Sequence, residues 1–348
     1  MKNIKLSNFS NVYILSPYFQ TGGPELLHQL CDALRMGGIN ACIVYVDANY
    51  KFFEASIIPA YQKYNVQTSV FIEDSRENVV VFPEIFFPIS KRYERVQKLF
   101  WWLSVDSYFN SCSTFSFPYL KFIGFRQYLR NFKNKYRSLI KSHMSLNEGT
   151  MSLREIKNSL ALNACQSFYA KTFLCKNGIE NSVLLRDYIN TEFVRTVHDN
   201  IKKNQILYNP KKGFNFTKRV IEKLPTYKFI RLEGLSREQL ANLMQESKLY
   251  IDFGNHPGQD RLPRECALNG CCLITGRKGA ANFYEDIPIP DEYKFDEKKD
   301  KIDSVVDKIK EVLENYDKKK CDFDFYRESI GREKEVFLNQ INEIFGLK

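Results

Sequence analysis

The chain has 348 residues, 44% of them hydrophobic, and a formal net charge of +10. This length is typical of two domains, each with enough apolar material for its own core. Neither an apolar run of eighteen residues nor a signal-peptide core at the start is present, so we expect a cytoplasmic protein without membrane spans. Nine scattered cysteines without a Cys-x-x-Cys pair indicate neither a disulfide framework nor a zinc site, and the four histidines lack metal-ligand spacing.

The N-terminal half begins with a predicted strand at 12–15, a helix at 26–36 and a second strand at 41–46. A turn containing Gly22 and Gly23 joins the first strand to the helix. The two glycines would let the backbone approach a phosphate or an acceptor closely, although simple turn geometry also explains them. No Gly-x-Gly-x-x-Gly pattern is present, which argues against a nicotinamide or flavin enzyme.

A second strand end in this half carries a carboxylate. The residues Trp-Trp-Leu-Ser-Val-Asp at 101–106 predict a buried strand that ends in polar residues. Asp106 is therefore a candidate to hydrogen-bond a bound ligand, and it is equally suited to capping the next turn. Glu84 follows another predicted strand and is a weaker candidate of the same kind.

The segment at 107–147 is basic and aromatic, with no Asp or Glu, and its apolar residues recur at helical spacing. Three interpretations remain open: a core-facing helix with a solvated basic edge, a helix at 121–141 on an anionic membrane surface, and a nucleic-acid-binding surface. No nucleic-acid motif supports the third interpretation. The cations are Lys121, Arg126, Arg130, Lys133, Lys135, Arg137 and Lys141.

Strands alternate with helices in the C-terminal half. Strands are predicted at 206–209, 227–232 and 249–253, with a helix at 216–223 and another that starts after Ser236, where Gln239 completes a capping box. This alternation predicts a parallel sheet, in which ligands bind off the carboxyl ends of the strands. The residues expected at those ends are Asn209, Lys212, Gly234 and the segment 256–265.

The segment 256–265 is the strongest ligand-binding signal in the chain. The turn His256-Pro257-Gly258 leaves backbone N–H groups beside the positive end of the following helix, which attracts phosphate. Arg261 can balance phosphate charge, and Glu265, one helical turn deeper, can accept hydrogen bonds from ribose or sugar hydroxyls. A strand-to-helix turn whose charges are merely solvated is the alternative.

Several segments, taken in order, resemble the GT-B glycosyltransferases of family 4 type, and the resemblance spans nearly the whole chain. It implies an α/β fold of two Rossmann-like, doubly wound parallel-sheet domains that face across a cleft. The acceptor domain would be 1–183 and the nucleotide-sugar donor domain 184–325, with a C-terminal helix at 326–348 crossing back. The matching segments are 21–25, 167–178, 183–193, Lys212-Gly213, and Pro-Arg-Glu-Cys-Ala-Leu-Asn-Gly at 263–270 before a predicted strand at 271–275.

The resemblance also implies roles for single residues. Lys212 would bind the donor diphosphate, Glu265 would hold the nucleotide ribose, and the segment 183–193 would be the interdomain linker. The family usually has a second Glu eight positions before Glu265, where this chain has Pro257. Asp260 is the nearest substitute for that carboxylate.

The expected reaction is transfer of a glycosyl group from a nucleotide-diphosphate sugar to a saccharide hydroxyl, without cofactor or metal. Preorganised cations and N–H groups would stabilise the negative charge on the departing diphosphate. The expected catalytic residues are Asp106, Lys212, Asp260 and Arg261. The expected donor-binding residues are Gly22, Gly23, Asn209, Lys212, Gly234, His256, Gly258, Arg261, Glu265, Gly279 and Ala280.

Family 4 resemblance implies retention of the anomeric configuration and a saccharide or lipid-linked saccharide acceptor in surface polysaccharide, O-antigen or capsule synthesis. The enzyme would then work in the cytoplasm or at the inner face of the cytoplasmic membrane. Two alternatives remain open. An inverting enzyme needs a general base, for which Glu25 and Asp106 are the candidates. A non-catalytic protein that binds sugar nucleotides or nucleic acid is the other, favoured by Pro257 in place of a carboxylate.

Overall fold

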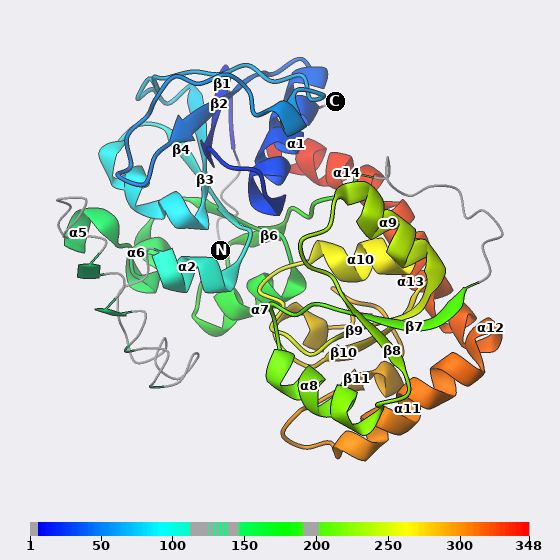
Figure 1. The fold of residues 1–348 in the computed structure, drawn as a ribbon. Helices are drawn as coiled ribbons and strands as arrows, with labels where there is room; N and C mark the ends of the chain where they lie inside the picture. Colours follow the sequence, from blue (N-terminus) through cyan, green and yellow to red (C-terminus); the bar gives the residue numbers. More distant parts are fainter. Residues whose placement is uncertain are drawn as a thin grey trace. The chain divides into compact units, whose positions relative to one another are not determined.

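The structure is a computed structural model that describes residues 6–111, 146–190 and 202–347, together with Phe125, Leu129, Phe132, Lys133, Tyr136 and Arg137. Contacts within the chain divide it into two compact units (Figure 1). Unit 1 comprises Met1–Arg186 and Val336–Lys348, and unit 2 comprises Asp187–Glu335. The chain therefore passes from unit 1 into unit 2 once and returns once.

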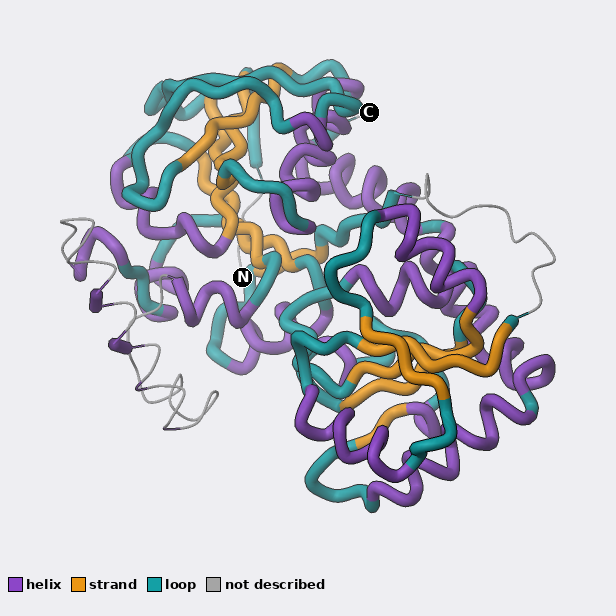
Figure 2. The backbone as a smooth tube through the Cα atoms, in the orientation of Figure 1, coloured by secondary structure: helices purple, strands orange, loops and turns teal. Residues whose placement is uncertain are grey.

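Unit 1 is built on a six-stranded, all-parallel sheet with the order β2-β1-β3-β4-β5-β6 (Figure 2). Its strands are nearly continuous apolar runs, because both faces of such a sheet are covered. The residues from Val79 to Phe82 in β3, for example, are completely buried. The strands are β1 (Asn11–Pro17), β2 (Asn40–Val46), β3 (Asn78–Pro83), β4 (Gln97–Trp102), β5 (Leu162–Cys165) and β6 (Ser182–Leu184).

Two helices of unit 1 begin at serine side chains that accept hydrogen bonds from the free N–H groups of the first turn. Ser152 and Glu155 form a capping box at the start of α6 (Leu153–Asn158). The Ser167 hydroxyl accepts a hydrogen bond from the Ala170 amide at the start of α7. The other elements described are α1 (Gly22–Met36), η1 (Pro59–Tyr61), η2 (Glu84–Arg92), α2 (Val105–Ser111) and α5 (Leu146–Gly149), and α7 spans Phe168–Lys176.

Unit 2 is built on a five-stranded, all-parallel sheet with the order β11-β10-β9-β7-β8. Its central strands are the most apolar; Leu249, Tyr250 and Ile251 of β9 are completely buried. The sheet order places β9 beside both β7 and β10, so the loops after these three strands leave the same edge. The strands are β7 (Lys203–Tyr208), β8 (Lys228–Arg231), β9 (Ser247–Asp252), β10 (Cys272–Gly276) and β11 (Lys294–Phe295).

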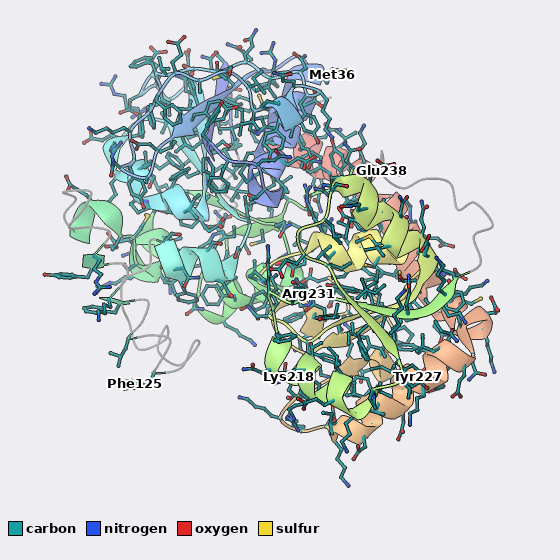
Figure 3. All side chains as sticks on the ribbon, in the orientation of Figure 1. Met36, Phe125, Lys218, Tyr227, Arg231 and Glu238 are labelled. Atoms are coloured by element: carbon teal, nitrogen blue, oxygen red, sulfur yellow. The ribbon has the colours of Figure 1, made fainter. Side chains whose placement is uncertain are left out.

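The helices of unit 2 cover this sheet with one apolar face each. In α11 the buried residues Val305, Ile309 and Val312 recur at helical spacing. Polar side chains point outward, as Lys218 on α8 and Glu238 on α9 do in Figure 3. The helices are α8 (Phe214–Lys223), α9 (Arg237–Glu246), α10 (Arg261–Leu268), α11 (Ile302–Glu314), α12 (Tyr316–Lys319) and α13 (Asp324–Gly331), with η4 (Ala280–Asn282), η5 (Asp291–Tyr293) and η6 (Lys320–Phe323). The last helix, α14 (Glu333–Phe345), begins in unit 2 and belongs to unit 1 from Val336 onward.

The α/β fold class predicted from the sequence is confirmed, and so is the capping box of Ser236 and Gln239 at the start of α9. The predicted strand at 101–106 is wrong beyond Trp102, where β4 ends. The Ser104 hydroxyl accepts the Ser107 amide at 3.0 Å, which starts α2 and places Asp106 in its first turn. No helix within the described residues is long and apolar enough to cross a bilayer.

Most of the predicted basic and aromatic helix lies outside the described residues. Four apolar members of it are described as helical: Phe125, Leu129, Phe132 and Tyr136. All four are exposed, and Phe125, labelled in Figure 3, is 65% exposed. The exposure of these four side chains therefore does not support the interpretation in which the apolar face of the helix packs on the core.

Candidate functional site

The loops after β7, β9 and β10 meet closely at the carboxyl edge of the unit 2 sheet. A Cβ at Gly213 would overlap the backbone of Phe253, and a Cβ at Gly279 would overlap the carbonyl oxygen of His256. Both glycines also have φ of +61°, in the left-handed region that favours glycine. Main-chain contact that only glycine permits therefore joins the three loops into one loop cluster, defined here as residues 209–213, 253–260 and 276–280.

Lys212 and Asp260 form the ion pair of this loop cluster, with 2.5 Å between Nζ and Oδ2. Gly254 lies beside the pair, where a Cβ would overlap that of Lys212. The Lys212 side chain is 34% exposed and that of Asp260 is 21% exposed. A charged ligand can therefore reach both partners of the pair.

His256 is completely buried between two carboxylates of the cluster. Its Nδ1 lies 3.4 Å from Asp260 Oδ2 and its Nε2 lies 3.7 Å from Asp252 Oδ1, and neither nitrogen forms a hydrogen bond with another described residue. Asp252 is held by the Tyr250 hydroxyl at 2.7 Å and the Gly254 amide at 2.8 Å. Burial and then the Asp252 charge raise the pKa of Tyr250. Asp252 and Tyr250 were not singled out in the sequence, where they read as strand residues.

α10 begins beside the loop cluster, with Arg261 as its first residue. Glu265, one turn deeper, accepts a hydrogen bond from the Arg237 guanidinium at 3.0 Å. Arg237 is the first residue of α9 and its side chain is 50% exposed, whereas that of Glu265 is 18% exposed. The carboxylate singled out in the sequence is therefore paired with a cation from a neighbouring helix.

Arg264 occupies the buried face of α10 and is 1% exposed. It donates to Asp187 Oδ2 at 2.9 Å and to Glu333 Oε2 at 3.0 Å. Burial acts to lower the pKa of Arg264, but the two carboxylates raise it. Burial raises the pKa of Glu333 to about 7 against the influence of Arg264, and the Asp187 carboxylate adds to the rise.

The other residues expected on unit 2 lie at the same sheet edge. Asn209 follows β7, and its side-chain oxygen accepts an amide from its own turn at 3.0 Å. Gly234 follows β8 with φ of +70°, and Gly258 is buried in the loop after β9. The Ala280 amide donates to His256 O at 2.7 Å, so this predicted donor is already used within the protein.

In unit 1 the Gly-rich turn lies at the carboxyl end of β1, where α1 begins at Gly22. The Tyr61 hydroxyl donates to Thr21 O at 2.8 Å and accepts from Thr21 N at 3.0 Å, which fixes the turn. A Cβ at Gly23 would meet only Leu103, at an ordinary 3.8 Å. The packing of unit 1 therefore does not by itself require glycine at position 23.

The first turns of α1 bury two titratable groups. The Glu25 carboxylate, 8% exposed, accepts a hydrogen bond from the Tyr64 hydroxyl at 2.9 Å. His28 donates from Nδ1 to Pro24 O at 2.7 Å and accepts at Nε2 from the Tyr45 hydroxyl at 3.1 Å, in the tautomer that the carbonyl demands. Burial lowers the pKa of His28 to about 4, so its ring is neutral at physiological pH.

Two further carboxylates lie near the carboxyl ends of β3 and β4. Glu84 is 3% exposed and accepts the Leu103 amide at 2.9 Å, and burial raises its pKa to about 7. Asp106 is partly buried in the first turn of α2. Burial and then the Asp106 charge raise the pKa of Tyr169. Glu84 was the weaker candidate from the sequence, yet of the two it is the carboxyl group whose pKa is clearly raised in unit 1.

No family model and no curated protein sequence matches this chain. Solved structures do match its fold. HepE of Anabaena in complex with UDP-glucose matches with a TM-score of 0.58 and 11% identity, over 97% of this chain and 99% of that one. Sucrose-phosphate synthase from Thermosynechococcus elongatus matches with 0.62 and 10%, over 96% and 98%. WaaG, a glycosyltransferase involved in lipopolysaccharide biosynthesis, matches with 0.57 and 11%, over 97% and 100%.

At 10–11% identity, these similarities concern the fold alone. They extend over nearly the whole length of each chain, and they confirm the GT-B architecture expected from the sequence. The likeness therefore covers both units together with the returning C-terminal segment.

Proposed function

We propose that this protein is a glycosyltransferase that transfers a sugar from a nucleotide-diphosphate sugar to a saccharide acceptor. The observation that carries the proposal is the loop cluster of unit 2, in which an accessible Lys212 and the start of α10 lie at the carboxyl edge of a parallel sheet. Sheets of this kind bind nucleotides at that edge. HepE, which has the same fold, was solved with UDP-glucose, and this supports a uridine nucleotide as the first donor to test.

Lys212 and Arg261 are the proposed diphosphate contacts. Breaking the anomeric C–O bond leaves negative charge on the diphosphate, and preorganised cations lower the barrier by stabilising that charge. Before the donor binds, Asp260 holds the Lys212 ammonium group. The phosphates then compete with Asp260 for the same cation, and the amides of Gly258 and Gly279 supply further donors.

Glu265 is the proposed ribose ligand. Its carboxylate has a second acceptor oxygen besides the one bonded to Arg237, so a ribose hydroxyl can bind without breaking that ion pair. His256 and Asp260 take the place of the carboxylate that the family pattern has at position 257. Asn209 and Gly234 line the same edge and complete the proposed donor site.

The proposed stereochemical outcome is retention, by resemblance to family 4 enzymes. An inverting reaction is the second candidate, for which Glu25, in the first turn of α1, and Asp106, in the first turn of α2, are the proposed general bases. A general base must reach the acceptor hydroxyl. In either reaction Asp106, with Gly22 and Gly23, is proposed to contact the acceptor or the transferred sugar.

The proposed acceptor is a saccharide, free or lipid-linked, in surface polysaccharide, O-antigen or capsule synthesis. If the acceptor is lipid-linked, the enzyme would act in the cytoplasm, at the inner face of the membrane that holds the acceptor. The exposed Phe132 and Tyr136, with Lys133 and Arg137 among them, are suited to an anionic membrane surface. Binding of nucleic acid is not part of the proposal.

The test is incubation of the purified protein with UDP-, GDP- and dTDP-sugars while nucleoside diphosphate release is followed. A glycosyltransferase hydrolyses its own donor slowly without acceptor, so one nucleotide series should yield release above the blank. A non-catalytic binding protein would bind a donor in calorimetry and release nothing. When an acceptor is found, NMR of the new anomeric centre separates retention from inversion.

A further inference from the structure

One buried guanidinium in unit 2 contacts three separate segments of the chain. Besides its bonds to Asp187 and Glu333, Arg264 donates to the carbonyl oxygen of Gln259 at 2.9 Å and lies 3.4 Å from that of Asp260. Arginine offers five N–H donors in a rigid plane, so one guanidinium can donate to partners that lie in different directions. Arg264 therefore connects the loop after β9 to two distant parts of the sequence.

The two distant partners lie where the chain enters and leaves unit 2. Asp187 is the first residue of unit 2, directly after Arg186, and Glu333 precedes Val336, where the chain returns to unit 1. Glu333 also accepts the Ile189 amide at 3.3 Å. Both connections between the units are thus tied to each other and to Arg264.

The loop contacts of Arg264 point to the proposed donor site. Asp260, whose carbonyl oxygen lies near Arg264, holds Lys212 with its side chain. Glu265, the proposed ribose ligand, is the next residue along α10. A displacement of Arg264 would therefore move the residues on both sides of the donor site.

Stability alone is a poor reason to bury these three charges. Removing one arginine and two carboxylates from water is costly, and replacing such a buried ionic cluster with apolar side chains of similar volume is often neutral or stabilising. The α10 site is otherwise apolar, with Cys266 and Ala267 completely buried. A buried ionic cluster instead selects one arrangement of its partners, because any other arrangement leaves the guanidinium buried without its carboxylate partners.

We propose that Arg264 is a positioning residue that couples the shape of the donor loop, residues 254–260, to the two chain connections at Asp187 and Glu333. Occupation of the loop by a nucleoside diphosphate would tighten both connections, and loosening either connection would weaken the loop. The ligand in this inference rests on the proposed function, whereas the coupling itself does not.

Hydrogen exchange of the unliganded protein tests the coupling directly. At about pH 8.5, above the raised pKa of Glu333, the wild-type carboxylate is ionised, and Glu333→Gln should accelerate exchange of the amides at 254–260 about tenfold because a neutral amide holds Arg264 less tightly. The matched control is Glu335→Gln, the same substitution on an exposed residue of the same helix turn, which should leave the loop unchanged. Equal loop exchange in the two variants, or acceleration spread evenly over the β9 and β10 amides, overturns the proposal.

UDP provides the second arm. In the wild-type protein, UDP should slow exchange at 187–190 and at 333–335, and in Arg264→Lys it should slow exchange only at the loop, because lysine cannot bridge two carboxylates and two carbonyls at once. Protection of both connections in Arg264→Lys overturns the coupling. Absence of UDP, GDP and dTDP binding by the wild type contradicts the proposed function instead, and the unliganded comparison then decides the coupling alone.

Discussion

Lys212 Nζ lies 2.5 Å from Asp260 Oδ2, so the cation best placed for a diphosphate is already neutralised by a carboxylate from the neighbouring loop. Such a pair keeps the lysine in position before the ligand arrives. It also sets a competition, because phosphate must replace or join the carboxylate. The pair is partly exposed, and its contribution to folding is accordingly small.

Lys212→Ala and Arg261→Ala should lower turnover far more than thermal stability. Loss of one preorganised charge contact to a leaving group costs on the order of 100-fold in rate, whereas loss of the partly exposed ion pair of Lys212 changes the free energy of unfolding by about 1 kcal/mol or less. Donor hydrolysis rates and melting temperatures check this. Lys218→Ala, on the exposed face of α8, is the control and should keep the wild-type rate. Wild-type turnover in both site variants would place the diphosphate elsewhere.

Glu265→Gln should weaken donor binding while the fold is retained. The charge-assisted hydrogen bonds of a carboxylate to ribose hydroxyls are worth about 1.5–3 kcal/mol, which calorimetry with the nucleoside diphosphate measures. Arg237→Gln removes the partner of Glu265 without removing the carboxylate. The affinity of the Arg237→Gln variant for the nucleoside diphosphate should stay nearer to that of the wild type. Unchanged affinity in Glu265→Gln contradicts the ribose role.

Gly213→Ala and Gly234→Ala should separate backbone strain from close packing. Both glycines have positive φ, and an L-residue there costs about 1–2 kcal/mol. A Cβ at Gly234 meets nothing within 4 Å, whereas one at Gly213 overlaps the Phe253 backbone. We expect Gly213→Ala to destabilise the protein more in denaturant unfolding and to weaken nucleotide binding. Equal effects of the two substitutions would show that the loop contact adds nothing.

Glu333→Gln should change how stability depends on pH. The folded protein raises the pKa of this carboxyl from 4.5 to about 7, so the protonated form is the one that folding favours. Its stabilising contribution is therefore complete below pH 4.5 and is lost as the pH rises to about 7, by on the order of 3 kcal/mol. The groups that face it are Arg264, Asp187 and Tyr326.

Denaturant unfolding at several pH values measures this contribution as the difference between wild type and Glu333→Gln. Other titrating groups, including Glu84, cancel in that difference. Glu335→Gln serves again as the exposed control. A difference that stays constant between pH 4.5 and pH 7.5 contradicts the raised pKa.

Replacement of Arg126, Arg130, Lys133 and Arg137 with Gln should reduce binding to anionic vesicles. Each cation near such a surface is worth on the order of 1 kcal/mol, and the effect should weaken with added salt. Donor hydrolysis, and transfer to a short soluble acceptor, should persist in the variant. A wild-type protein that ignores anionic vesicles at low salt would remove the membrane surface from the proposed function. Preference for single-stranded nucleic acid over vesicles would favour the alternative interpretation.

Local patterns in the sequence determined the alternation of strands and helices, the parallel sheets and the capping box of Ser236 with Gln239. These features depend on side-chain period and on neighbouring residues, which a sequence displays directly. The ends of β7 and β9 could also be predicted, because the sequence changes from apolar to polar residues where each strand gives way to its loop. The loop carrying Asp260 and the helix carrying Glu265 were accordingly predicted together.

The error at Asp106 arose from the same kind of pattern. Four apolar or aromatic residues before it read as one strand, but Ser104 caps a new helix, and hydroxyl groups can favour a cap over strand pairing.

Only the tertiary structure decided the partners of Arg264, the ion pair of Lys212 with Asp260 and the main-chain contacts at Gly213 and Gly279. Each joins segments that lie far apart in the chain, and their proximity depends on the order of strands in the sheet. A charged residue such as Arg264 reads as surface from composition, since burial of its charge is favourable only when distant carboxylates converge on it. The sequence therefore located the proposed donor loop, while the folding of distant segments onto it determined which charges it holds.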